Sequence, residues 1–475
     1  MKRQLMNGVT GMLALSVAVT AGGTARAATS TATKPRPTAS TSTRTVSGAA
    51  SGMSALDGNS TPVRSSRGSG RDSRQGGRAV TRAGATFTAR DTGRAAVFAG
   101  NFAKLALTGC VIRKTGDGRN AAVLAVTPSH MTLNGCAVTT DGAGSGGVLA
   151  SGADAHIHLA NSTIRTNSAD LEANGAVAAG GGRVTLDNVH IATAGPRSAA
   201  LATAAAAGGG GGGAGGGTVV ARDGTMTTDG APVIHSGGLI KVYNADGIAH
   251  GGRHAAVVEG NGSIDAVDTA LTGPAGAGFA AADARGAADT GTAADTGTAA
   301  DTGTAADAGG AATYAMTGGS LTATTGPAFD VGRASAKITV RGGAVITPGN
   351  GVLVSVADGG SATFMASGQK LAGDVVSIGS AATSLTLKHD TILAGAITGA
   401  ALELDSSSRW VVTGDSTLTT LTGAVTSIAG NGHDVSYDPR LAANQWLEGR
   451  THPLAGGGKL SPAQLVPAQL VPAEF

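Results

Sequence analysis

Three short stretches decide the fold: Leu107-Thr108-Gly109-Cys110-Val111-Ile112, Leu133-Asn134-Gly135-Cys136-Ala137-Val138 and Leu159-Ala160-Asn161-Ser162-Thr163-Ile164. Each begins 26 residues after the one before and places an aliphatic residue, a Gly or Asn, and a second aliphatic residue at fixed positions. Aliphatic residues that alternate with polar ones predict β-strands, and Gly or Asn allows a bend with positive φ. A strand unit that recurs at a period in the twenties indicates a repeat protein of stacked coils.

The same unit recurs from about residue 83 to residue 430. Later copies start at Leu186, Ala221, Ala266, Met316, Val340, Ala366 and Leu387, with a looser copy at 240–244. The second aliphatic residues of the copies at 340 and 387 are Val345 and Ile392. One coil is too small to bury its apolar side alone, so stacked coils must share a continuous core. We therefore predict an all-β fold, a right-handed parallel β-helix over residues 83–430.

The composition agrees with a thin, elongated core. The 475 residues include 78 Gly but only 2 Trp, 3 Tyr and 7 Phe, too few to anchor several globular cores. Hydrophobic residues nevertheless make up 41% of the chain, which argues against disorder throughout. A leucine-rich repeat would show a Leu lattice and an Asn ladder, and we expect neither.

The segments outside this repeat have a different composition. Residues 1–27 are typical of a secretory signal peptide, with Lys2 and Arg3 before a short apolar stretch and cleavage expected after Ala27. Residues 28–82 are rich in Ser, Thr and Arg and predict a disordered basic arm. Such an arm could contact nucleic acid, anionic lipid or acidic polysaccharide, but a solvated leader is the preferred interpretation.

Two low-complexity insertions interrupt the repeat, and a tail follows it. Residues 205–217 are rich in Gly, and residues 281–310 repeat Ala-Ala-Asp-Thr-Gly-Thr. Both are expected to leave the stack at a turn without breaking it. Residues 431–475 are expected to form a C-terminal tail module.

Cys110 and Cys136 occupy the same position of successive units. Neighbouring coils would place their Cα atoms about 4.8 Å apart, which is within the range that a disulfide tolerates. An exported protein meets an oxidising compartment, so a disulfide is the preferred interpretation. A stacked pair of free thiols and a metal site remain as alternatives.

Motifs for catalysis or metal binding are weak. Asp-Thr-Gly occurs at four positions without the apolar context of an aspartic protease, and His156 and His158 lack a third metal ligand. Five aspartates appear scattered over turns instead of clustered as in a glycan-cleaving groove. The Asp-Thr-Gly copies are Asp91, Asp289, Asp295 and Asp301, and the five aspartates are Asp187, Asp223, Asp246, Asp265 and Asp268. We expect no enzyme, no cofactor and no metal site.

Residues 385–458 resemble the last coils and tail of pertactin-type autotransporter passengers. The matching segments are Ala401-Leu402-Glu403-Leu404-Asp405-Ser406-Ser407-Ser408-Arg409-Trp410-Val411-Val412-Thr413-Gly414-Asp415-Ser416-Thr417-Leu418 and Asn444-Gln445-Trp446-Leu447-Glu448-Gly449-Arg450-Thr451-His452-Pro453-Leu454. The resemblance implies an exported, structural or adhesive passenger with a parallel β-helix. Trp410 and Trp446 are expected to cap the end of its core.

These observations lead to one expected function and one alternative. We expect a monomer at the cell surface, secreted or periplasmic, that presents loops from a rigid solenoid to a host-surface or polysaccharide ligand. We expect no specific nucleic acid partner, no transmembrane segment and no C-terminal translocator barrel. The alternative is a polysaccharide lyase or hydrolase on the same fold.

Overall fold

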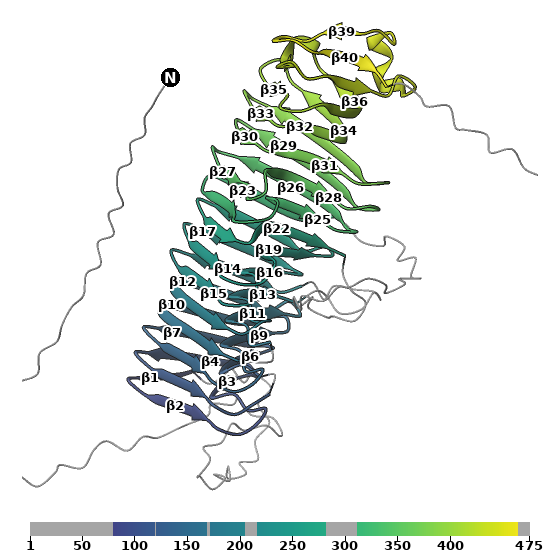
Figure 1. The fold of residues 1–475 in the computed structure, drawn as a ribbon. Helices are drawn as coiled ribbons and strands as arrows, with labels where there is room; N and C mark the ends of the chain where they lie inside the picture. Colours follow the sequence, from purple (N-terminus) through teal and green to yellow (C-terminus); the bar gives the residue numbers. More distant parts are fainter. Residues whose placement is uncertain (1–78, 119, 169–171, 205–215, 282–310, 464–475) are drawn as a thin grey trace, which may run out of the picture. The chain divides into compact units, whose positions relative to one another are not determined.

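The computed structural model describes residues 79–118, 120–168, 172–204, 216–281 and 311–463. These residues form a parallel β-solenoid of about 14 turns (Figure 1). The prediction of an all-β, parallel solenoid is therefore confirmed. The predicted signal peptide, nearly all of the basic arm, nearly all of both insertions and the last residues of the tail lie outside the described residues.

Each full coil contributes one strand, or half of a longer strand, to each of three parallel faces. Face 1 consists of β1 (Ala79–Ala83), β4 (Ala103–Thr108), β7 (Ser129–Asn134), the first half of β10 (Ala155–Asn167), the first half of β12 (Arg183–Ala194), β14 (Thr218–Arg222), β17 (Leu239–Tyr243), β20 (Ser263–Val267), β23 (Ala312–Thr317), β26 (Ser335–Arg341), β29 (Ser361–Ser367), β32 (Ala382–Lys388), and the later parts of β34 (Ile397–Leu404) and β36 (Ser416–Thr422).

Face 2 follows face 1 after a bend in each coil. It consists of β2 (Thr86–Ala89), β5 (Val111–Lys114), β8 (Ala137–Thr140), the second halves of β10 and β12, β15 (Thr225–Thr228), β18 (Asp246–Ala249), β21 (Ala270–Gly273), β24 (Ser320–Ala323), β27 (Val345–Thr347), β30 (Lys370–Ala372), β33 (Ile392–Ala394), β35 (Arg409–Val411) and β37 (Ile428–Ala429).

Face 3 completes each coil. It consists of β3 (Val97–Ala99), β6 (Val123–Val126), β9 (Val148–Ser151), β11 (Ala176–Ala179), β13 (Leu201–Thr203), β16 (Ile234–Ser236), β19 (His254–Glu259), β22 (Ala275–Ala280), β25 (Phe329–Val331), β28 (Val352–Val356), β31 (Asp374–Ser377), the first residues of β34 and β36, β38 (Val435–Tyr437) and β40 (Lys459–Pro462). The short strand β39 (His452–Pro453) pairs antiparallel with β40, and two short 3-10 helices, η1 (Val425–Ser427) and η2 (Ala442–Leu447), lie near the C-terminal end.

The register of face 1 confirms the sequence repeat. Leu107, Leu133, Leu159 and Leu186 pair directly with one another in successive coils. The same buried column continues through Ala221, Val242, Ala266, Met316, Val340, Ala366 and Leu387. Because Val242 belongs to the looser copy at 240–244, that copy is a full coil of the stack.

The bend between faces 1 and 2 has the predicted positive φ. The φ values are 60° at Gly109, 48° at Asn161 and 52° at Asn188. The side chains of this bend also pair across coils, since Asn188 donates to Asn161 at 2.9 Å and Asn161 donates to Asn134 at 3.1 Å. Only the contact between Asn188 and Asn161 joins equivalent bend positions in these three coils, because Asn134 pairs with Ala160 and precedes the bend residue Gly135.

Two second aliphatic residues were misassigned by one position. Ile346, not Val345, pairs with buried Leu321, and Val345 is 59% exposed. Likewise Leu393, not Ile392, is the fully buried residue of its coil. The bends of these two coils are one residue longer, and a shift of one residue exchanges the two sides of a strand.

Both insertions leave the stack at the same corner. The first lies between β13 and β14 and the second between β22 and β23, so each runs from face 3 to face 1. The stack is continuous across them, because Leu186 pairs with Ala221 and Ala266 pairs with Met316. The parallel stack itself runs from Ala79 to Pro462, so β38 and β40, within the predicted tail module, belong to its last coils.

Candidate functional site

The outer side of face 1 carries a row of basic residues in successive coils. Alternate residues of a strand point to opposite sides of a sheet, so the inner columns of face 1 form the core and the outer columns meet solvent. Lys104, His130, His156 and Arg183 pair with one another in one outer column. We call these four residues the basic row. Lys104, His130 and Arg183 are exposed, and His156 is half-buried.

The rings of His130 and His156 stack within this row. Their centroids are 4.8 Å apart with an interplanar angle of 14°, which matches the spacing of neighbouring strands. Partial burial, followed by the nearby His130 and Arg183, lowers the pKa of His156 below its usual value, while Asp154 acts in the opposite direction. Two unit charges at this distance repel by about 1 kcal/mol even in water.

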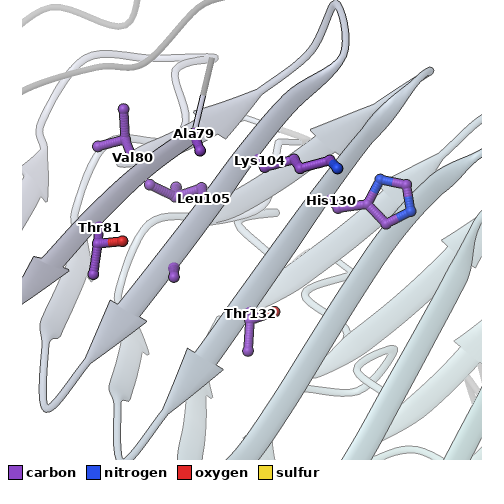
Figure 2. Close-up of a pocket in the computed structure, with 8 residues that line it drawn as sticks. Ala79, Val80, Thr81, Lys104, Leu105, His130 and Thr132 are labelled. Carbon is purple, nitrogen blue, oxygen red and sulfur yellow. The ribbon is translucent and has the colours of Figure 1, made fainter. Parts of the chain in front are cut away.

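The first half of the row borders a shallow hollow on the same face. The hollow has a volume of about 360 Å³. Its lining residues come from β1, β4 and β7, and they are Ala79, Val80, Thr81, Lys104, Leu105, Ala106, His130 and Thr132. Figure 2 shows the Lys104 amino group directed toward the His130 ring. The hollow thus combines the Lys104 amino group and the His130 imidazole with the hydroxyls of Thr81 and Thr132.

Asp187, a carboxylate on the outer side of face 1, is already paired. His158 Nε2 lies 2.7 Å from Asp187 Oδ2, and an Arg222 Nη atom lies 3.4 Å from Asp187 Oδ1. The Arg222 guanidinium also lies over the Tyr243 ring, 5.3 Å from its centroid. His156 and His158 therefore share one side of β10 but have different partners. Within the described residues, no group of three or more His, Cys, Asp or Glu could hold a metal ion.

The other candidate aspartates are distributed over several coils. Asp223 and Asp268 are bend residues with φ values of 52° and 47°, which is the conformational role that their position in the repeat suggested. Asp265 pairs with Lys241 at 3.9 Å. Asp246 is an exposed residue at the start of β18, and Asp91 forms a local pair with Arg94 at 3.6 Å. Asp289, Asp295 and Asp301 lie outside the described residues.

Cys110 and Cys136 are buried in successive coils, as the repeat requires, and the structure has both as free thiols. The flanking residues Val111 and Ala137 pair directly. The Cys136 thiol donates to the Leu107 carbonyl at 3.7 Å, and burial raises its pKa. The stacking on which the disulfide prediction relied is present, but the bond is not formed in the structure.

The two tryptophans have different roles. Trp410 pairs with Leu393 and Ile428 inside the stack, is fully buried, and donates to the Gly395 carbonyl at 2.8 Å. It is a core residue, because η2, β38 and β40 follow it at the C-terminal end. Trp446 lies on η2, is 46% exposed, and donates to the Leu421 carbonyl of β36 at 3.0 Å.

The residue that closes this end was missed in the sequence. Asn444 of η2 is buried, accepts a hydrogen bond from the Leu421 amide at 2.9 Å, and donates to the carbonyls of Thr419 and Asp438 at 2.7 Å each. Its side chain thus forms hydrogen bonds with the Leu421 amide and the Thr419 carbonyl of β36. These backbone groups would otherwise be available to pair with another strand. A single Asn after the last repeat gives no periodic signal that could have identified it.

A second polar cluster on the outside of face 3 was also missed. His254 Nε2 lies 3.1 Å from Asp330 Oδ2, although the two residues are 76 positions apart. The His254 ring packs against Gly278, and a Cβ at Gly278 would lie only 2.8 Å from the ring atoms. The hydrogen bond from His254 lowers the pKa of Asp330. Long insertions separate such partners in sequence, so only the coil register brings them together.

No protein-family model matches this chain, and no curated protein matches it in sequence. Among the described residues, no helix has both the length and the apolar character needed to cross a membrane.

Proposed function

We propose that this chain is an exported, non-enzymatic structural protein of the pertactin-type passenger class, in which a rigid solenoid presents variable loops. The observation that carries the proposal is that both low-complexity insertions lie at the same corner of the solenoid, between face 3 and face 1. Each leaves face 3 and returns to face 1 in register. The coils on either side of each insertion pair in register, so extra residues at this corner leave the pairing of the core unchanged, which suits a scaffold that displays loops.

The C-terminal end gives further support. The segment 401–418, which resembles the last coils of such passengers, contributes the core residue Trp410 and the beginning of the strand β36. Asn444 and Trp446 then bond to the backbone of β36. A closed end prevents the stack from continuing by edge pairing, and a monomeric display protein needs such an end.

Cell fractionation tests the proposal. The full chain would be produced in a Gram-negative host, and its N-terminus would be sequenced in each fraction. We expect a product that begins at Ala28 in the periplasm, on the surface or in the medium. A control variant, Leu13→Arg with Leu15→Arg, interrupts the apolar stretch and should stay uncleaved in the cytoplasm. A wild-type chain that keeps Met1 and remains cytoplasmic would refute export.

A further inference from the structure

We propose that the basic row, together with the adjoining hollow, binds a linear carboxylated polysaccharide laid across the coils of face 1. This inference goes beyond the proposed function, because binding by this surface does not depend on how or whether the chain is exported. The described residues that carry it are Lys104, His130, His156 and Arg183.

The regular spacing of the row is the first argument. Lys104 and Arg183, which are positively charged, and the two histidines between them stand on four successive strands, and the centroids of the two stacked rings are 4.8 Å apart. A linear polymer with an acidic group on its repeating units can meet several of these cations at once, which raises its apparent affinity over that of a single contact. Thr81 and Thr132 in the hollow offer hydroxyls for sugar oxygens.

The local electrostatics are the second argument. None of the four positions of the row holds a carboxylate, and the stacked cations repel one another when the histidines are protonated. His130 and Arg183 oppose a positive charge on His156, and Asp154 favours it. Lys104 pairs with His130, and His158 stands on the same side of β10 as His156. Asp187 is paired with His158 and Arg222, so it neutralises those side chains rather than the row. An anionic ligand would relieve the repulsion within the row.

The side chains around the row favour a polysaccharide over a single-stranded nucleic acid. Sites for single strands usually supply aromatic platforms on which bases stack. The residues that flank the row in the next outer column are Ala106, Thr132, His158 and Thr185, none of them Phe, Tyr or Trp. Ala106, Thr132 and Thr185 have small side chains, which leave space beside the row for a polysaccharide chain.

Titration of the full-length protein with polygalacturonate at low ionic strength tests the proposal. The variant Lys104→Gln with Arg183→Gln should bind about tenfold more weakly, since each lost cation removes one contact to the polymer. A matched control, Lys337→Gln with Arg341→Gln, removes one Lys and one Arg from β26 on the same face and should bind as wild type does. Unchanged circular dichroism would show that each variant keeps the β-solenoid.

The same titration at different pH values tests separately how much the histidines contribute to binding. Binding by the wild type should strengthen as the pH falls from 7.5 to about 5.5, because each imidazole that gains a proton adds a positive charge to the row. The variant His130→Gln with His156→Gln should lose this gain while keeping its affinity at pH 7.5. A gain of equal size in that variant would overturn the part of the proposal that concerns the histidines.

Two further ligands decide the class of partner. Fully methyl-esterified polygalacturonate, which lacks the charge, should not bind measurably, and single-stranded DNA should bind more weakly than the acidic polymer. The proposal would be overturned if the Lys104/Arg183 variant and the Lys337/Arg341 control lost the same affinity for polygalacturonate. It would also be overturned if the ester bound as tightly as the acidic polymer, or if DNA bound more tightly. Shortening of the polymer during the titration would leave the binding site standing but would contradict the proposed non-enzymatic function.

Discussion

The inner and outer columns of face 1 repeat residues at the same spacing with opposite consequences. Inside, Leu107, Leu133, Leu159 and Leu186 lie over one another and are buried, so repetition extends one apolar core. Outside, the basic row repeats positive charge over the same four coils. Like residues in register stabilise a solenoid when they are apolar and oppose its folding when they are charged. A charged row therefore points to a ligand more strongly than an aliphatic one does.

The largest expected effect comes from the inner column. Leu159→Ala leaves a cavity between Leu133 and Leu186 and should destabilise the protein by about 3 kcal/mol. The matched outer change is Thr185→Ala on the neighbouring coil, which should alter stability by less than about 0.5 kcal/mol. Urea unfolding followed by circular dichroism measures both. Equal effects of the two substitutions would contradict the division into inner and outer columns.

Replacement of a charged residue in an inner column should instead stabilise the protein. Lys114 is buried, and its amino group has no hydrogen-bond partner among the described residues. The residues at its position in the next coils are Thr140 and Thr166, which each donate to a backbone carbonyl at 2.6 Å. Lys114→Thr should stabilise the protein by about 1–3 kcal/mol, because it removes an unsatisfied buried group.

The same substitution should change how stability depends on pH. Burial lowers the pKa of Lys114 below 10.5, so the unfolded chain binds more protons than the folded chain between the lowered value and 10.5. Wild-type stability should therefore rise with pH across this window. The rise should be smaller in Lys114→Thr when thermal unfolding is followed from pH 8 to about pH 10.5. An identical rise in both proteins would show that Lys114 is not its source.

Two buried tyrosines provide a smaller comparison within the core. Burial raises the pKa of Tyr314, and among the residues that the structure describes its hydroxyl has only the Met316 sulfur, at 3.9 Å, as a partner. Tyr314→Phe should therefore change stability by less than about 1 kcal/mol, in the stabilising direction. Tyr437 instead donates to the Arg450 carbonyl at 3.0 Å, so Tyr437→Phe should cost about 1 kcal/mol. The reverse order of the two variants would contradict this hydrogen-bond assignment.

The smallest expected effect lies in the basic row itself. Arg183→Thr removes one charge next to His156 and should stabilise the ligand-free protein by about 0.3 kcal/mol at pH 5.5 and low salt. The gain should disappear at about 1 M salt, where exposed charges are screened. Thermal unfolding at the two salt concentrations measures it. Destabilisation by this change would mean that the row holds the coils together.

The sequence predicted the features that repeat and missed those that occur once. The column from Leu107 to Leu387 and the bend residues follow from periodicity alone. The shifts at Ile346 and Leu393 could not be foreseen, because a bend longer by one residue leaves the aliphatic pattern locally ambiguous. His156 was noticed in the sequence, but only the coil register shows that it stacks on His130.

Single residues at the ends and across insertions left no periodic signal. Asn444 acts through backbone groups of a strand more than 20 residues earlier, and His254 reaches Asp330 across an insertion. Trp410 was expected at the end of the core, yet further strands cover it. In each case the contact depends on the number of coils between the two residues. The separation in sequence does not reveal that number.

Disulfide mapping tests most directly whether equivalent residues lie over one another in successive coils. The full chain would be refolded in a glutathione redox buffer of oxidising poise, so that burial does not limit access to the thiols, and its peptides analysed without reduction. The stacked coils should give a folded monomer in which Cys110 is linked to Cys136. A folded protein whose two cysteines form disulfides only between chains would contradict the stacking.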